Sequence, residues 1–375
     1  MKVLFVSFAN GKRPGAREIQ VSRVIQALEN SGVEIVPVLI KNELVKSNKT
    51  HFLNVKNRLN RIDIVLRSVL PYSLYNRGIL NKLEDIIIKE SPSIILTSSN
   101  PLESHIAGVF AKKKYGLKWI ATFSDPRPLS KLPKPYGEKR EYLRTIYEIR
   151  FLKRVLSQAD SIIMPSLLGI ELTQRIVKMN ISNKSYVIPH IGFSKVCGEP
   201  SKSYLIHSGK LVAKRSSENV LLALKEYFKS RKGKISKLVC LGFVSNEFKE
   251  LIVKYDMLDY VEFPGILSLQ ESRKWLSESK AILVIEADMQ YSPFLPSKFC
   301  EAASCNKPIL AISPKESSIS YYLDRHISGI SVRNSSDDIL RGLNLLNSID
   351  VVRNPRLFSA QSVAKKYKEI MSRLI

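Results

Sequence analysis

The stretch LPSKFCEAASCNKPILAI, residues 295–312, joins a helix start to a buried strand. Pro296-Ser297 is typical of a helix start, and Pro308–Ile312 has the continuous apolar side chains of a strand inside a parallel sheet. Free amides at such a helix N-terminus can hold phosphate. Glu301, about one turn further in, could accept hydrogen bonds from a ribose. A capped helix with a solvated glutamate fits the same residues equally well.

The alternation of strand and helix continues through the second half of the chain. Strands are expected at 203–207, 237–241, 261–263, 281–285 and 308–312. Helices are expected at 216–229, 245–256, 269–278, from about 297, and at 359–374. This pattern is typical of a parallel sheet covered by helices.

The first half repeats the pattern. Strands are expected at 2–8, 33–40, 94–96, 119–123, 161–164 and 186–188, with helices after the first and third of these and at 140–157. Residues 189–203 are rich in Pro, Gly and Ser and mark a domain boundary. We therefore expect an α/β protein with two doubly wound Rossmann-like domains facing across a cleft, with ligands bound outside the carboxyl ends of the strands.

Composition excludes disorder and fibrous repeats as the main state. The 375 residues suggest about two domains, and 44% hydrophobic with 25% charged residues is ordinary for a globular protein. The net charge of +25 favours anionic partners, although solvated surface lysines would give the same excess. The four cysteines form neither CxxC pairs nor zinc spacing, which suits a reducing compartment. We expect no signal peptide, transmembrane helix, metal site or nucleic-acid partner.

Three loops at predicted strand ends are candidate sites. In Gly209–Arg215 a glycine turn is followed by Lys210 and Arg215, which suit a diphosphate. The loop Ala9–Gly15, with Gly11 and Gly15, lacks the GxGxxG and GxxxxGK[ST] patterns of nucleotide-binding loops but could line the cleft. In Ser124-Asp125-Pro126-Arg127 the aspartate is a candidate base, or simply a turn former before proline.

The segment 54–70 predicts a basic amphipathic helix. Val55, Leu59, Ile62, Leu66 and Val69 share one helical face, and Lys and Arg side chains lie elsewhere around it. Such a helix could lie on an anionic membrane surface, or it could pack on the core as an ordinary surface helix.

A specific resemblance to a known family comes from five motifs taken in order: TSSNP, FSDPRP, SGKLVAKR, VEFPG and LPSKFCEAASCNKPILAI. The chain resembles a family 4 glycosyltransferase of the bacterial polysaccharide-assembly type, the enzymes of capsule and lipopolysaccharide synthesis, with the two-domain GT-B fold. The resemblance covers nearly the whole chain. It implies an acceptor-side domain at 1–195, a nucleotide-sugar-binding domain at 196–355, and a C-terminal helix at 356–375 that packs back toward the first domain.

The resemblance implies roles for individual positions. The expected site residues are Lys210, Arg215, Ser297 and Lys298 for the donor diphosphate, Glu301 for the ribose, Phe263 and Gly265 for the base, Gly11 and Gly15 for the cleft loop, and Ser124, Asp125 and Arg127 for catalysis.

Two positions depart from the family pattern. The family's paired glutamates are seven residues apart, and here the first would fall on Pro293. Many members also have a histidine at the position that resembles Ser124. The first departure puts the usual contact to the donor sugar in doubt, and neither Glu286 nor Asp288 is assumed to replace it.

The resemblance implies transfer of a sugar, with retention, from a nucleotide-diphosphate sugar to a hydroxyl of a glycan acceptor. No cofactor or metal is expected, and the nucleotide sugar is a co-substrate. The acceptor is expected to be lipid-linked, and the protein to be cytoplasmic and peripheral on the inner face of the plasma membrane. The alternatives are a nucleotide-sugar 2-epimerase of the same architecture and a non-catalytic sugar-nucleotide binder. The sequence names neither base, sugar, acceptor nor oligomeric state.

Overall fold

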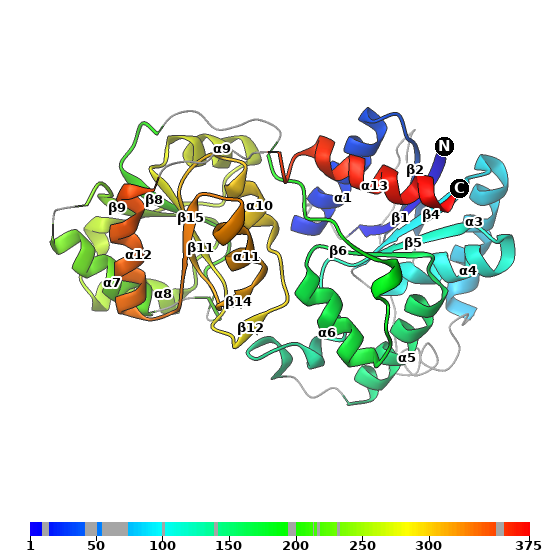
Figure 1. Cartoon of the computed structure of the whole chain (residues 1–375), viewed down its shortest axis with the longest axis horizontal. Helices are drawn as coiled ribbons and strands as arrows, with labels where there is room; N and C mark the ends of the chain where they lie inside the picture. Colours follow the sequence, from blue (N-terminus) through cyan, green and yellow to red (C-terminus); the bar gives the residue numbers. More distant parts are fainter. Residues whose placement is uncertain are drawn as a thin grey trace. The chain divides into compact units, whose positions relative to one another are not determined.

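The computed structural model describes residues 1–9, 15–41, 51–54, 74–99, 102–138, 142–193, 200–212, 214–215, 218–230, 233–349 and 356–375. Their contacts divide the chain into two compact units. The first unit contains residues 1–132, 136–189 and 360–375, and the second contains 133–135 and 190–359. Each unit is built on its own sheet (Figure 1).

The first unit has a seven-stranded sheet in the order β3-β2-β1-β4-β5-β6-β7, with every neighbouring pair parallel. Its strands are β1 (Lys2–Ala9), β2 (Glu34–Lys41), β3 (His51–Asn54), β4 (Ile94–Ser98), β5 (Lys118–Thr122), β6 (Ser161–Met164) and β7 (Ser185–Val187). The central strands are fully buried, since helices cover them. Continuous apolar runs such as Ile94-Ile95-Leu96 are what such strands require.

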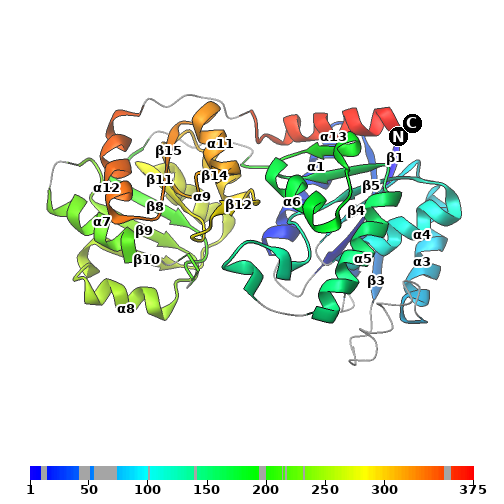
Figure 2. The ribbon, with the colours of Figure 1, turned by 60° about the horizontal axis from the view of Figure 1, so that its bottom comes forward.

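The helices of this unit are α1 (Ala16–Asn30), α3 (Leu74–Glu90), α4 (His105–Tyr115), α5 (Tyr142–Gln158), α6 (Leu167–Val177) and α13 (Ala360–Leu374). Helix α1 ends before Gly32, whose φ of +83° favours glycine. The C-terminal helix α13 packs against α1, so the two ends of the chain belong to one unit (Figure 2). Val363, Tyr367 and Met371 recur at helical spacing on its buried side.

The second unit has a six-stranded sheet in the order β10-β9-β8-β11-β13-β15, again parallel throughout. Its strands are β8 (Tyr204–Ser208), β9 (Lys237–Leu241), β10 (Val261–Gly265), β11 (Ala281–Ile285), β13 (Ile309–Ile312) and β15 (Gly329–Val332). A separate small ribbon pairs β12 (Tyr291–Ser292) with β14 (Glu316–Ser317). Its helices are α7 (Glu218–Lys229), α8 (Asn246–Lys254), α9 (Leu269–Glu278), α10 (Ser297–Ala303), α11 (Ser318–Arg325) and α12 (Ser336–Leu345).

Two apolar clusters cover the two faces of the second sheet. Leu205 and Leu283 point into the cluster that contains residues of α7, α8 and α12. Ile206 and Ile282, each adjacent to one of these leucines in the sequence, point into the cluster that contains residues of α9, α10 and α11. Successive strand residues face opposite sides of a sheet, so both faces of these strands are buried. This arrangement confirms the predicted doubly wound α/β fold.

The predicted element positions agree closely with the structure. β6, β9, β11 and α9 begin and end at the predicted residues, and the other predicted strands and the helices at 140–157, 216–229, 245–256 and 359–374 are found within a few residues. The predicted amphipathic helix 54–70 lies outside the described residues, except for Asn54, which ends β3. Among the described helices, none is both long and apolar enough to span a membrane.

Candidate functional site

The second sheet reverses its strand order between β8 and β11. The helices that follow these neighbouring strands lie on opposite faces, which leaves a crevice at the carboxyl ends where doubly wound proteins bind ligands. A small pocket of about 40 Å³ occupies this place. Its walls are His207, Ser208, Gly209, Arg215, Leu276, Ile282, Leu283, Val284, Ile285, Pro296, Lys298, Glu301 and Ala302. We call it the switch-point pocket. Its size admits a hydroxyl or a phosphate oxygen rather than a whole nucleotide.

Glu301 is the carboxylate of the switch-point pocket. It lies on α10 and is only 4% exposed. The ammonium of Lys298, one turn earlier, donates to Glu301 Oε2 at 2.8 Å and remains about half-exposed. A buried carboxylate needs a cation or hydrogen-bond donors around it. Lys298 supplies one, and Glu301 lines the pocket.

The loop after β8 brings Arg215 to the same pocket. Glycines allow this loop and the loop after β9 to approach, since a Cβ on Gly242 would come within 2.7 Å of the Gly209 carbonyl oxygen. Gly242 also has a φ of +107°. Arg215 is half-buried and lines the pocket, whereas Lys210 is exposed and does not. Of the expected diphosphate pair, the structure therefore places only the arginine in the pocket.

Three other predicted donor residues lie apart from the pocket walls. Phe263 and Gly265 belong to β10, two strands away from β8, and Phe263 packs partly against the core. Ser297 begins α10, between Pro296 and Lys298, which do line the pocket. The roles of these residues stay predictions.

In the first unit, Ser124 and Arg127, which follow β5, form hydrogen bonds with other residues of the protein. Ser124 Oγ donates to the Ser99 carbonyl at 3.2 Å. Arg127 Nη2 donates to Glu148 Oε1 at 2.8 Å, and both side chains are nearly buried. Asp125 is half-buried beside them. The structure thus gives Arg127 a structural partner that the sequence reasoning did not anticipate, and the catalytic role of all three residues stays a prediction.

Gly15, one of the two predicted loop glycines, caps α1. Its amide donates to Glu18 Oε2 at 2.9 Å, the reciprocal bond of a helix N-terminus. Arg17 holds the same glutamate at 2.9 Å and donates to the Phe8 carbonyl. The amide of Gly15 is therefore occupied inside the protein. Gly11 lies outside the described residues.

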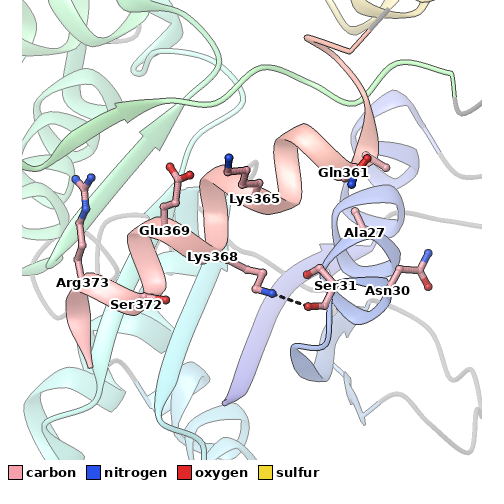
Figure 3. A pocket seen from close by; sticks show the side chains of 10 residues that line it. Ala27, Asn30, Ser31, Gln361, Lys365, Lys368, Glu369, Ser372 and Arg373 are labelled. Atoms are coloured by element: carbon pink, nitrogen blue, oxygen red, sulfur yellow. Dashed lines mark hydrogen bonds between the residues drawn. The ribbon is translucent and has the colours of Figure 1, made fainter.

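A larger pocket of about 880 Å³ lies between α1 and α13 of the first unit (Figure 3). The ammonium of Lys368 crosses it and donates to the Ser31 carbonyl at the end of α1, at 2.7 Å. The end of α1 leads into the beginning of β2, so this pocket lies toward the amino ends of the strands. Ligands of doubly wound sheets bind at the opposite edge. We therefore assign the candidate site to the second unit.

Solved structures with the same architecture include sugar-handling enzymes of two kinds. The lipopolysaccharide outer core galactosyltransferase WaaB is 15% identical, with a TM-score of 0.67, and all of each chain is covered. HepE of Anabaena, in complex with UDP-glucose, is 13% identical with a TM-score of 0.61, covering 100% of this chain and 99% of that one. The chain has the GT-B fold. UDP-GlcNAc 2-epimerase from Methanocaldococcus jannaschii is also similar, at 11% identity and a TM-score of 0.60 over both whole chains.

No protein-family model matches the sequence, and a search of curated proteins finds no match. Because the identities to the solved structures are below 16%, the likeness shows the GT-B fold and leaves the reaction to be argued from the site.

Glu286 directly follows Ile285 of the switch-point pocket wall, and Pro293 lies further along the same connection between β11 and α10. Pro293 is buried. Glu286, 6% exposed, accepts hydrogen bonds from Ser292 Oγ at 2.6 Å and Ser313 Oγ at 2.5 Å. Burial raises the pKa of this carboxyl, and the two serine bonds oppose that effect. Glu286 also lines a third pocket, of about 480 Å³, at the ends of β11, β13 and β15. Both carboxylate oxygens are thus held by the protein itself.

His207 is among the residues of the switch-point pocket that the sequence reasoning missed. His207 lies on β8, is 5% exposed, and is part of the pocket wall. The available signal is a histidine that directly follows the apolar residues Tyr204-Leu205-Ile206 and is still within the strand β8. Across the residues that the structure describes, no group of three or more His, Cys, Asp and Glu side chains is arranged to hold a metal ion.

Proposed function

We propose that this protein is a glycosyltransferase that moves a sugar from a nucleotide-diphosphate sugar to a hydroxyl of a glycan acceptor. The observation that carries the proposal is the convergence of Arg215, Lys298 and the buried Glu301 on the switch-point pocket. Two cations beside one buried carboxylate match a nucleotide, whose diphosphate needs positive charge and whose ribose offers hydroxyl donors. The GT-B fold of nucleotide-sugar enzymes supports this choice.

In this proposal the cations of the pocket drive the departure of the leaving group. Negative charge grows on the nucleoside diphosphate as its bond to the sugar breaks. Arg215 can hold two oxygens at once through its planar guanidinium, and the half-exposed Lys298 can turn toward the same group. A charge held in place before the reaction, as that of the half-buried Arg215 would be, stabilises such a transition state without further rearrangement, whereas Lys298 would first leave Glu301. These side chains supply the positive charge, so we propose a reaction without a metal ion.

The further course of the reaction is proposed from the resemblance of the sequence to family 4 glycosyltransferases and from the excess of basic residues. We propose retention by transfer on one face of the sugar, with the leaving phosphate oxygen taking the proton of the attacking hydroxyl. The acceptor is proposed to be lipid-linked and to belong to cell-surface polysaccharide synthesis. This would place the protein on the inner face of the plasma membrane, with residues 54–70 as the contact.

The first experiment measures thermal shifts with UDP, GDP, ADP and CMP, with and without EDTA. A nucleotide that binds the folded state raises the melting temperature by mass action. We expect one nucleoside diphosphate to raise it regardless of EDTA, and Glu301→Ala to weaken its affinity about tenfold or more. Glu250→Ala, which removes an exposed glutamate of α8, is the matched control and keeps the shift. If no nucleotide shifts the wild-type protein, the proposed donor site is wrong.

The epimerases among the similar structures give a second candidate function. An epimerase converts the nucleotide sugar alone, whereas a transferase needs an acceptor. Incubating the matching UDP- or GDP-sugar without acceptor and analysing the product by NMR separates the two, since we expect the sugar to be recovered unchanged at carbon 2.

A further inference from the structure

The imidazole of His207 has one ring nitrogen bonded and the other buried without a described partner. Nδ1 lies 3.1 Å from the Leu283 carbonyl oxygen on the neighbouring strand β11. A carbonyl only accepts, so Nδ1 carries the proton and Nε2 of the neutral ring is an acceptor. Among the described residues, Nε2 has no hydrogen-bond partner, and almost none of its surface is exposed. A buried acceptor left without a donor is costly, which suggests that a ligand supplies one.

The unpartnered nitrogen lies at the switch-point pocket. A Cβ added to Gly209, another wall residue, would lie 3.4 Å from His207 Nε2. The charged groups of the pocket are Arg215 from the loop after β8, and Lys298 and Glu301 from α10, while β11 contributes apolar residues. Burial, aided by the charges of Arg215 and Lys298, lowers the pKa of His207 to about 4. The ring is therefore neutral near pH 7.

We propose that His207 is a donor-binding residue whose Nε2 accepts a hydrogen bond from a ribose hydroxyl of the bound nucleotide. This inference rests on the proposed function, because the hydroxyl is that of the nucleotide sugar. Phosphate oxygens at neutral pH accept hydrogen bonds and cannot pair with a second acceptor. Arg215 and Lys298 already offer positive charge to phosphate. Of the groups near a diphosphate, the ribose hydroxyls are the donors that Nε2 lacks.

Two substitutions distinguish the proposed hydrogen bond of His207 Nε2 to the ribose from the hydrogen bond of Nδ1 to the Leu283 carbonyl. In His207→Asn the short amide can still donate to the Leu283 carbonyl but does not reach the pocket. In His207→Gln the longer amide places an oxygen near the position of Nε2 and gives up the bond to Leu283. A purely structural histidine would be replaced better by asparagine, and a ribose-binding one by glutamine.

The probes are UDP, GDP, ADP and CDP, followed by the 2′-deoxy and 3′-deoxy forms of the one that binds, titrated by calorimetry at pH 7.5 in two buffers of different ionisation enthalpy. We expect wild type to prefer the ribonucleotide over one deoxy form by about fivefold to tenfold, the size of one neutral hydrogen bond. His207→Asn should lose that preference and His207→Gln should keep most of it. Wild type should take up essentially no proton on binding.

Each contrary result has a separate meaning. If the wild-type protein binds a nucleotide without preferring ribose, or if His207→Asn keeps the full preference, the inference is wrong and the proposed function stands. Uptake of close to one proton per nucleotide also overturns it, because the ring would then donate to a phosphate. If none of the four nucleotides binds wild type, the proposed function fails first. The wild-type comparison and the proton count require no variant to fold.

Discussion

His105 in the first unit and His207 in the second occupy similar places with different surroundings. Each lies near the carboxyl end of a central strand, and each has one ring nitrogen bonded within the protein. The second nitrogen of each is buried without a described partner. His105 packs against the ring of Phe123, with centroids 4.5 Å apart, whereas His207 lines a pocket with Arg215 and Lys298. The same residue type thus belongs to a core in one unit and to a candidate site in the other.

The arginines that follow the strands show the same contrast. Arg127, after β5, is bonded to the nearly buried Glu148. Arg215, after β8, lines the switch-point pocket. Both sheets are parallel and doubly wound, so topology alone would offer a ligand site at either edge. Of these residues, those of the second unit line a pocket at the edge of the sheet, and those of the first unit are bonded or packed within their own domain.

The largest expected effect is on folding of the first unit. Arg127→Met removes the nearly buried partner of Glu148 and leaves it only the exposed Arg144, so it should lower the free energy of unfolding by about 3 kcal/mol, the cost of breaking a buried ion pair. Arg144→Met is the matched control, because Arg144 donates to the same Glu148 Oε1 at 3.0 Å but is exposed. It should cost less than about 1 kcal/mol. Urea unfolding measures both, and equal costs would contradict a structural role for Arg127.

The next effect is on nucleotide binding by the second unit. Arg215→Met should weaken the binding of the nucleoside diphosphate by about 10-fold to 100-fold, the size of one or two charge-assisted hydrogen bonds. Lys210→Met, in the same loop but with an exposed side chain outside the pocket wall, should weaken it by less than about threefold. Calorimetric titration gives both affinities. A larger loss in Lys210→Met would show that the loop, rather than the pocket, holds the diphosphate.

Much of the fold could be predicted because its signals are local. Ala281–Ile285 is a run of apolar residues that a buried parallel strand requires, and its bounds were predicted correctly. Helices α6 and α12 were not predicted although each begins with a serine cap. Ser166 Oγ accepts from the Gly169 amide at 2.9 Å, and Ser335 Oγ from the Asp338 amide at 3.2 Å. Such caps are visible in sequence and could have located both helices.

The candidate site was predictable only in part. Arg215 lies between β8 and α7 and Glu301 lies in the short helix α10, and parallel strands bring the segments that follow them to one edge of the sheet. The partner of Arg127 was not predictable, because Glu148 is 21 residues away on another element. His207 was missed for a related reason. The proposed role of His207 depends on which ring nitrogen faces the Leu283 carbonyl and which faces the pocket. This orientation follows from the pairing of β8 with β11.

The smallest expected effect is on the pH dependence of stability, in which the two histidines can be compared. Burial lowers the pKa of His105 to about 3 and that of His207 to about 4, from an ordinary value of 6.5. In this pH range the two histidines bind protons in the unfolded chain but not in the folded chain. Their contribution to stability is therefore full above pH 6.5 and is lost as the pH falls toward 4. Each histidine should lower the free energy of unfolding by about 1 kcal/mol as the pH falls from 6.5 to 5.5. Urea unfolding at both pH values should show this loss reduced in His105→Asn and in His207→Asn. Bound nucleotide should leave the contribution of His105 unchanged, and a nucleotide that altered it would break the contrast between the two units.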